Sequence, residues 1–448
     1  MDPGSRPPFR RKARLSEFRD LQDRAGVAAL VTDRSRPVRG TLNADHCPGV
    51  LRMHEAADGW LVRVRLPGGR LTAGALDAVG DVAALGSGVV ELTSRASIQL
   101  RGLTPGSGDP GARRLEEAGL MPSPLHDRVR NILASPVAGR HRSSLVGTDD
   151  VVAGLDQGLC ADRDLAELPG RFLFTVVDGS GALGAHRADV SLEASVVAGA
   201  VAFRLHLADA ATTLMAAPVH AARLALRAAR GFLDLVRADG VDAWGVAGLR
   251  DGPGRVARHL GGDLEPDSPP AIGDPLPVGT LIQADGRVAV TVLPPLGRLD
   301  GPIVRGLAEL SRRHCSEVRV SPRRTLTMLD LSAAEAQSVA SDLRSLGLVT
   351  SSGSGWSGLS ACAGKGACVK ARVDVRGAAE DRAAVRGPRA LGEHWSGCER
   401  CCGKPIGAPV AITATDSGLI VEVAGETRTA QSVSEALELL AGAQERAR

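Results

Sequence analysis

The sequence contains no tyrosine and few other aromatic residues, with four tryptophans and six phenylalanines among 448 residues. Aliphatic side chains must therefore fill the interior. No apolar run approaches the roughly 18 residues that a membrane-spanning helix needs, so we expect no membrane partner and a cytoplasmic location. The net charge of only +3, without basic stretches interleaved with aromatic residues, argues against nucleic acid as a partner.

Two kinds of cofactor motif are also missing. The ten histidines show no HxxxH or HxH grouping, which speaks against a histidine-rich metal site. No GxGxxG follows a predicted strand, so we do not expect a bound dinucleotide. Reducing electrons should therefore come from an external donor, either a ferredoxin or an NADH-linked reductase.

Half of the eight cysteines form two closely spaced pairs, Cys362-x5-Cys368 and Cys398-x3-Cys402, with Cys401 as an extra neighbouring thiol. Zinc sites more often combine two Cys-x2-Cys pairs, whereas longer gaps suit the larger ligand cage of a cubane iron-sulfur cluster. Glycine-rich loops flank both pairs and let backbone amides approach cluster sulfurs. The pattern favours a cluster over zinc, and a metal site over buried structural thiols.

An internal repeat relates the two halves of the chain at a constant offset, since 297 − 69 and 323 − 95 both equal 228. At this offset a predicted strand around Val62 matches one around Val290, and the helix caps Thr72 and Asp300 coincide. The apolar faces of the two helices that follow also agree. We predict two similar strand-helix-strand units that pair about a pseudo-twofold axis. In the first unit, one further strand is expected to run from Val89 through to Arg101.

Carried further, the same offset places Cys362 opposite position 134 and Cys398 opposite position 170. These positions fall in two arginine-containing segments, 130–136 and 168–172. We therefore expect the first half to supply arginines where the second half supplies thiolates.

Composition and patterning divide the chain into six parts. The predicted parts are an N-terminal extension (1–45), a first repeat unit (46–115), an α/β domain with anion-binding arginines (116–250), a linker (251–278), a second repeat unit (279–345) and an α/β domain with the cysteines (346–448). Further strands are expected near 172–177, 201–207, 372–375, 410–415 and 419–423, and helices near 218–238 and 432–444.

Arginines and polar side chains recur at predicted strand ends and turns, where they can converge on a cleft between the halves. Arginine binds carboxylates and oxyanions through its fork geometry and keeps its charge. Our candidates for binding an anionic ligand are Arg95, Gln99, Arg101, Arg130, Asn131, Arg171, Arg323 and Arg324. Each arginine alone is equally consistent with a surface charge or a salt-bridge partner, and the repeat favours Arg95 together with Arg323. No catalytic residue is assigned.

Together these features resemble the superfamily of sirohaem-type sulfite and nitrite reductases and precorrin-3B synthases, over about residues 47–425. The likeness rests on the doubled Pro-x-Gly-Arg-Leu unit, Thr93-x-Arg95-x-x-x-Gln99, Arg130-Asn131, Leu168-Pro-Gly-Arg-Phe172 and the four cysteines. It implies an α+β fold, in which two ferredoxin-like half-domains pair about a pseudo-twofold axis beside two mixed α/β domains. It also implies a 4Fe-4S cluster on Cys362, Cys368, Cys398 and Cys402, with Cys402 nearest a tetrapyrrole in the cleft.

Within the superfamily, the segment Cys47-Pro48-Gly49-x-Leu51-Arg52 looks like precorrin-3B synthase. The third cysteine also lacks the Pro-Asn that follows it in many reductases. Where reductases carry Lys-x-Lys in their oxyanion pocket, this chain has Arg171 and Leu173, so one cation is missing. Six-electron reduction of sulfite or nitrite needs that charge, whereas an oxygenase acting on the macrocycle does not.

The resemblance therefore implies an oxygen-dependent monooxygenase that converts precorrin-3A to precorrin-3B, by hydroxylation of the meso carbon between rings A and D and lactone closure by the ring A acetate. A mononuclear nonhaem iron is a further possible cofactor, with unassigned ligands. Two alternatives stay open. One is a sirohaem-dependent sulfite or nitrite reductase, and the other is a noncatalytic iron-sulfur or tetrapyrrole-binding module. Cys401 could also replace Cys402 as a ligand.

Overall fold

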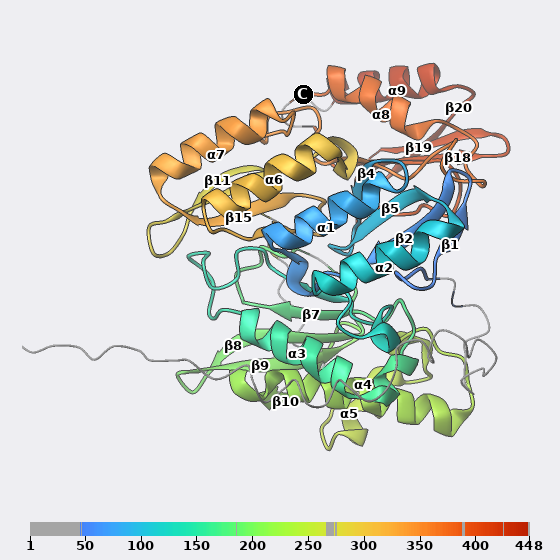
Figure 1. Ribbon diagram of the computed structural model, residues 1–448. Coiled ribbons are helices and arrows are strands. Elements are labelled where there is room, and N and C mark those ends of the chain that lie inside the picture. The colour runs from blue at the N-terminus through green and yellow to red at the C-terminus, as the bar shows by residue number, and fades with distance from the viewer. Residues whose placement is uncertain are drawn as a thin grey trace, which may run out of the picture. The chain divides into compact units, whose positions relative to one another are not determined.

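The structure, a computed structural model, describes residues 45, 47–184, 186–265, 273, 276–387, 390–423 and 425–446, with side chains up to 441 (Figure 1). The predicted N-terminal extension lies outside these residues except for Asp45. In the described part the strands form four five-stranded sheets. None of the helices found there has the length and apolar character required to cross a membrane.

Two of the sheets come from the predicted repeat. The first has the order β1 (His54–Ala56), β2 (Gly59–Val64), β5 (Ile98–Leu103), β4 (Val89–Leu92), β13 (Arg298–Asp300). The second has the order β11 (Gly279–Ile282), β12 (Val288–Val292), β15 (Leu326–Leu331), β14 (Val318–Val320), β3 (Arg70–Leu71). The helices of these units are α1 (Ala73–Ala84), α2 (Gly108–Glu117), α6 (Gly301–Arg313) and α7 (Ala333–Ser345).

Each repeat sends one short strand into the sheet of the other repeat. β3 of the first unit pairs with β14, where Leu71 lies opposite Val318, and β13 of the second unit pairs with β4, where Leu299 lies opposite Val90. Both pairs occupy the same repeat positions, so the exchange is symmetric. It confirms the predicted duplication and its pseudo-twofold arrangement.

The connection into each exchanged strand has the same unusual backbone in both repeats. Gly68 and Gly69 have φ values of 64° and 71°, and Leu296 and Gly297 have 54° and 70°. The helix caps agree as well, because the side chain of Thr72 accepts a hydrogen bond from the amide of Ala75 and Asp300 does the same for Ile303. The offset of 228 residues thus holds in the local geometry.

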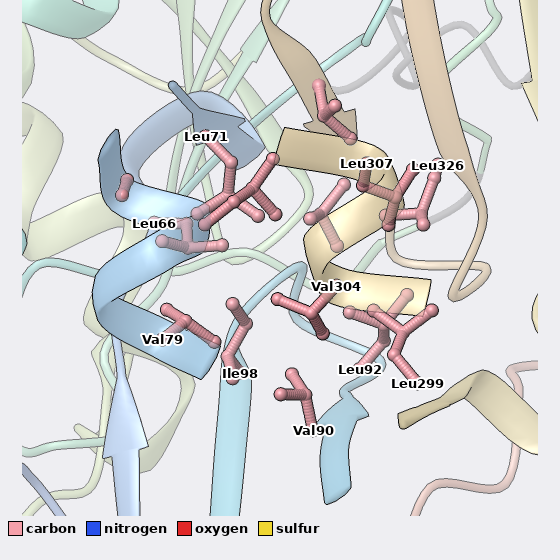
Figure 2. Close-up of a cluster of buried hydrophobic side chains, with 14 of the residues drawn as sticks. Leu66, Leu71, Val79, Val90, Leu92, Ile98, Leu299, Val304, Leu307 and Leu326 are labelled. Atoms are coloured by element: carbon pink, nitrogen blue, oxygen red, sulfur yellow. The ribbon is translucent and has the colours of Figure 1, made fainter. Parts of the chain in front are cut away.

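One hydrophobic core joins the two repeats. Figure 2 shows Val304 and Leu307 of the second unit among Leu66, Val79 and Ile98 of the first. Helices α1 and α6 run side by side in Figure 1. They approach so closely that a side chain on Gly80 of α1 would lie 3.3 Å from Val304. Small and branched aliphatic residues permit this packing, as the scarcity of aromatic residues requires.

The predicted single strand from Val89 to Arg101 is instead a hairpin, formed by β4 and β5. The hydroxyl of Thr93 accepts hydrogen bonds from the amides of Arg95 and Ser97, and Ala96 adopts a left-handed conformation with φ of 49°. These contacts turn the chain at the position where we predicted it to continue. Arg95 therefore lies at a hairpin tip.

The other two sheets also repeat each other. The third sheet has the order β10 (Ala210–Ala216), β9 (Ala200–Leu207), β8 (Val190–Val197), β7 (Phe174–Val177), β6 (Ile132–Ala134). The fourth has the order β16 (Leu359–Ala361), β17 (Glu393–Ser396), β18 (Val410–Thr415), β19 (Gly418–Val423), β20 (Glu426–Ala430). Their helices are α3 (Asp149–Ala161), α4 (Pro218–Asp239), α5 (Gly252–His259), α8 (Val375–Val385) and α9 (Val433–Arg446). This completes the α+β fold that we predicted.

Three details of the prediction are corrected here. No strand forms at 372–375, because Asp374 caps α8 and its carboxylate accepts hydrogen bonds from the next amides. Residues 252–259 of the predicted linker form α5, which packs on the core of the third sheet, while part of the remaining linker lies outside the described residues. Cys398 follows β17, whereas Gly170 precedes β7, so the offset does not extend to this pair.

An ion pair between Asp330 of β15 and Arg140 connects the second repeat with the first half of the chain. The guanidinium donates to both carboxylate oxygens at 2.9 Å to 3.1 Å, and Gln283 donates to the same carboxylate at 2.8 Å. These hydrogen bonds, led by those from Arg140, hold the pKa of Asp330 below its usual 3.8. The carboxylate thus stabilises the fold above pH 3.8, and this contribution disappears as the pH falls through the lowered pKa.

We expect Asp330→Asn to lower the free energy of unfolding by about 2 kcal/mol at pH 7, a typical value for charged hydrogen bonds. Asparagine tolerates the left-handed φ of 61° at this position, so backbone strain should not contribute. Denaturant unfolding at pH 7 and at pH 3 to 5 tests the prediction, since the difference from wild type should shrink below pH 3.8. Asp381→Asn, at an exposed position of α8, is the matched control. A difference that stays constant with pH would contradict the assignment.

Candidate functional site

One face of the first sheet is polar although the opposite face packs against helices. Val62 and Leu100 belong to the hydrophobic core, and the intervening side chains of Arg63 and Gln99 lie on the other face because side chains alternate along a strand. The strand register aligns Arg63, Gln99 and Glu91 in one row across the sheet. The predicted residue Gln99 therefore lies between a cation and an anion.

The four cysteines of the predicted cluster follow two neighbouring strands of the fourth sheet. Cys362 comes directly after β16, and Cys398 comes two residues after β17. These strands are parallel, so their carboxyl ends meet at one edge. The amide of Gly397 donates a hydrogen bond of 3.2 Å to the sulfur of Cys362. This contact already connects the two cysteine segments.

All four thiols share one neighbourhood. The pKa of Cys402 is raised first by burial and then by the nearby charges of Cys362, Cys398 and Cys368. Cys401 has a different surrounding, because its sulfur lies 3.6 Å from the hydroxyl of Thr413. Its backbone is also in the left-handed region, with φ of 48°. The geometry groups Cys402, and not Cys401, with the other three thiols.

A set of four thiols is compatible with the ligands of a cubane iron-sulfur cluster. Within the described ranges, no three His, Cys, Asp or Glu side chains lie close enough together to hold one metal ion. A cubane cluster places iron and sulfide between its thiolates, which therefore stand farther apart than the ligands of a single ion.

Glycines let the cysteine loops pack tightly. A side chain on Gly397 would lie 2.8 Å from the methyl group of Ala371 and 3.6 Å from the sulfur of Cys362. Gly364 has φ of 74° and lies against Val375 at the start of α8. The glycine-rich character of these loops, noted in the sequence, thus has a steric reason.

Two of the predicted anion-binding residues already use their polar groups in hydrogen bonds within the protein. Arg130 is buried and donates to both carboxylate oxygens of Asp156, at 2.6 Å and 2.8 Å. Asn131 is also buried, accepts from Arg65 at 2.9 Å and donates its amide hydrogens to backbone carbonyls. Their surroundings support a structural role, since their polar groups are already satisfied.

Arg101 is likewise paired, with Asp58 at 2.8 Å, and it also donates to the carbonyl of Ala367 at 2.5 Å. Ala367 immediately precedes Cys368. Although burial opposes it, the pKa of Arg101 is raised, first by the hydrogen bond with Asp58 and least by Cys368. Arg101 thus connects the polar sheet face to a cysteine loop and is not free to bind a ligand carboxylate.

Arg95 and Arg171 form a positively charged pair. Arg95 donates to the carbonyl of Arg171 at 2.7 Å, and its pKa is lowered first by burial and then by the charge of Arg171. Asp189, the carboxylate whose charge acts on Arg95, already accepts hydrogen bonds from the amides of Leu173 and Val246. No carboxylate in the described part of the chain forms an ion pair with either arginine. Two adjacent cations without such partners are well suited to an anionic ligand.

Sequence reasoning missed Arg63, which connects these cations to the thiols. Its Nε is buried without a hydrogen-bond partner among the described residues. Burial lowers its pKa, while the charges of Cys47 and Cys402 act in the opposite direction and that of Arg95 adds to the lowering. The available signal was the alternation of valine and arginine over residues 62–65, the first three of which lie in β2 and which we interpreted only as a strand.

Arg323 and Arg324 are adjacent in sequence but have different surroundings. Arg323 is exposed and lines a small cavity together with Pro136, Leu183 and Leu276, and its charge acts on His186. Arg324 is half-buried and donates to the carbonyl of Gly403 at 3.4 Å. The structure therefore brings Arg324 to the cysteine loops and places Arg323 at a separate cavity.

Ion pairs at equivalent positions connect each repeat unit with one α/β sheet. Glu91 of β4 pairs with Arg376 at the start of α8, at 2.6 Å. Arg319 of β14 pairs with Asp149 at the start of α3, at 2.9 Å. Glu91 and Arg319 differ by the repeat offset of 228, so the duplicated scaffold uses the same contact with opposite charges.

Comparison with known proteins agrees with these observations. The family model "Nitrite/Sulfite reductase ferredoxin-like half domain" matches residues 54–118 and 281–346. The two matched segments contain the two repeat units that exchange strands β3 and β13. The predicted duplication of a ferredoxin-like half-domain is confirmed.

Three relatives show the same low identity of 24%. A ferredoxin–nitrite reductase of Synechococcus elongatus aligns over 79% of this chain and 76% of its own length. A precorrin-3B synthase of a Sinorhizobium species aligns over 88% and 87%, and sulfite reductase [ferredoxin] 2 of Mycolicibacterium paratuberculosis over 80% and 67%. Identity alone therefore does not separate the branches, although all these relatives support an oxidoreductase.

The structure of the Mycobacterium tuberculosis NirA protein has the same fold, with a TM-score of 0.66 and 19% identity over 83% of this chain and 77% of that one. The family model and the curated relatives together confirm the superfamily resemblance predicted from the motifs. The chain is homologous to the nitrite and sulfite reductases and to precorrin-3B synthase, and it carries the nitrite/sulfite reductase ferredoxin-like half domain twice.

Proposed function

We propose that this protein is a precorrin-3B synthase, an oxygen-dependent monooxygenase that acts on precorrin-3A in the cytoplasm. The observation that carries the proposal is that charge interactions connect Cys402 with the other three thiols and with Arg63, and Arg63 with Arg95, which in turn donates a hydrogen bond to the carbonyl of Arg171. It combines a site for a redox cluster with cations for a polycarboxylate ligand.

In this proposal Cys362, Cys368, Cys398 and Cys402 hold a 4Fe-4S cluster, and the amide of Gly397 donates to the sulfur of Cys362. The cluster would supply single electrons delivered by an external donor. Arg101 fixes the loop before Cys368 through the carbonyl of Ala367, so the thiols keep their place relative to the polar sheet face.

The arginines bind and orient the substrate. Arg95 and Arg171 bind acetate or propionate groups, and Arg63 extends the positive surface toward Cys402. Gln99 lies opposite Arg63 in the strand register and can orient a polar group beside it. Arg323 contributes from its own cavity at the equivalent turn of the second repeat. We assign no ligands to a nonhaem iron.

The reaction adds one oxygen atom to the macrocycle. One atom of O2 forms the new C–O bond, and the other leaves as water after uptake of two electrons and two protons. The ring A acetate then closes the lactone without a further change in oxidation state.

Leu173 supports this reaction over reduction of sulfite or nitrite. Its side chain is buried in the hydrophobic core, and its amide donates to Asp189 at 2.9 Å. This position, where reductases are expected to carry the second lysine, therefore supplies no cation to a small oxyanion.

The test is a reconstituted assay. Anaerobically purified protein, supplied with precorrin-3A, a reductant and then oxygen, should yield a product heavier by one oxygen atom in mass spectrometry. Omission of the reductant, or of oxygen, is the control and should leave the substrate unchanged. Purification with a haem-like absorbance band, together with turnover of sulfite or nitrite, would instead identify the reductase alternative. A bound cluster without any turnover would support a noncatalytic module.

A further inference from the structure

Arg324 has a backbone conformation that is unfavourable for arginine. Its φ is 61°, in the left-handed region that side chains other than those of glycine, asparagine and aspartate rarely adopt. The repeat provides an internal comparison, because Ala96 occupies the equivalent position with φ of 49°. Serine and threonine hydroxyls stabilise both turns with the same amide hydrogen bonds. Alanine thus suffices for the turn, and the arginine side chain must serve another purpose.

The surroundings of Arg324 make room for its side chain beside the cysteine loops. A side chain on Gly403 would lie 2.5 Å from its Nη2, and one on Gly297 would lie 2.7 Å from its Cδ. Gly403 directly follows Cys402, and its carbonyl accepts the hydrogen bond from Arg324. The guanidinium is therefore placed by two glycines from different parts of the chain.

The charge of Arg324 has no ion-pair partner among the described residues. Glu91 and Cys362 are the negative groups that act on it. Glu91 forms its short ion pair with Arg376 at 2.6 Å, and the other group that acts on Arg324 is Cys362, one of the proposed cluster ligands. A half-buried cation is thus maintained next to the proposed cluster.

We propose that Arg324 is a positioning residue that raises the reduction potential of the cluster. This inference rests on the proposed cluster ligands and goes beyond the proposed reaction. Reduction adds one negative charge to the cluster, and a fixed cation nearby stabilises the reduced form more than the oxidised form. The effect should be large because the site is partly shielded from water.

The test is a redox titration of the purified holoprotein, followed by electron paramagnetic resonance and absorbance. For Arg324→Gln we expect the ratio of reduced to oxidised cluster at the wild-type midpoint to fall about tenfold. This corresponds to a shift of about 59 mV toward more negative potential for a one-electron couple. Iron and sulfide content should stay unchanged. Arg324→Lys, which keeps the charge, should change the ratio less than about threefold.

Arg305→Gln is the matched control, since it removes an exposed charge from α6 of the same repeat and should leave the potential unchanged. Glu91→Gln removes a negative charge that acts on Arg324 and should shift the potential in the opposite direction. If Arg324→Gln does not retain the cluster, the direction in which Glu91→Gln shifts the reduction potential tests the inference instead. An unchanged potential in Arg324→Gln, or a negative shift in Glu91→Gln, would overturn the inference. A wild-type protein without a cluster would instead overturn the proposed function.

Discussion

Replacing Cys402 with serine is expected to abolish the iron-sulfur absorbance of the protein, whereas replacing its neighbour Cys401 should leave it intact. Cys402 interacts electrostatically with the other three thiols, while Cys401 lies against the hydroxyl of Thr413. Serine is a poor ligand for cluster iron in place of a thiolate. Iron analysis should therefore find about four iron atoms per chain in Cys401→Ser and fewer than about one in Cys402→Ser.

This pair of variants is well matched, because both remove one sulfur atom from adjacent residues. It also resolves the ambiguity that the sequence left between Cys401 and Cys402. Loss of the cluster in Cys401→Ser with retention in Cys402→Ser would exchange their roles. Retention in both variants would contradict the proposed ligand set.

The second large effect is expected at Gly69, where the first repeat lies against β14 of the second. Its φ is 71°, and a side chain there would lie 2.0 Å from the carbonyl oxygen of Val320 in β14. Because β3 begins at the next residue and pairs with β14, the clash cannot be relieved without moving the exchanged strand. We expect Gly69→Ala to lower the free energy of unfolding by more than about 4 kcal/mol, or to yield no soluble protein.

Gly88 provides the control for backbone strain alone. It has nearly the same φ, 73°, but no atom lies within 4 Å of a side chain added there. Gly88→Ala should therefore lower the free energy of unfolding by only about 1–2 kcal/mol. Soluble yield and thermal unfolding of the two variants measure the difference. Equal losses of stability in the two variants would show that the close approach of Gly69 to Val320 does not contribute to the effect of Gly69→Ala.

The duplicated fold was predictable because several independent signals share one offset. Thr72 and Asp300 cap equivalent helices, and the apolar faces behind them agree. The hairpin at 93–97 was missed because its turn depends on the hydroxyl of Thr93 and a left-handed alanine, a residue that carries no turn signal. The start of α8 could have been found, since Asp374 is a strong helix cap.

The candidate site was only partly accessible from sequence. Spacing identified the cysteines as a group, because ligands of one centre are often close in sequence. The partners of buried arginines are often distant in sequence. Asp156, which pairs with Arg130, is 26 residues away. Arg63 was missed because alternation predicts a strand but not which face borders a site. Ion pairs between residues distant in sequence therefore determine which arginines are free to bind an anionic ligand.

The reciprocal strand exchange has an implication for the origin of the molecule. A chain with one repeat unit would have an unpaired β4 edge and a short strand projecting from its own sheet. Two such chains could satisfy both by forming an isologous homodimer, in which each copy completes its counterpart. Gene fusion would then allow the two copies to diverge. Equivalent positions of the two repeats now differ, with Ala96 in one and Arg324 in the other. Likewise Glu91 of the first repeat and Arg319 of the second carry opposite charges and bind different partners.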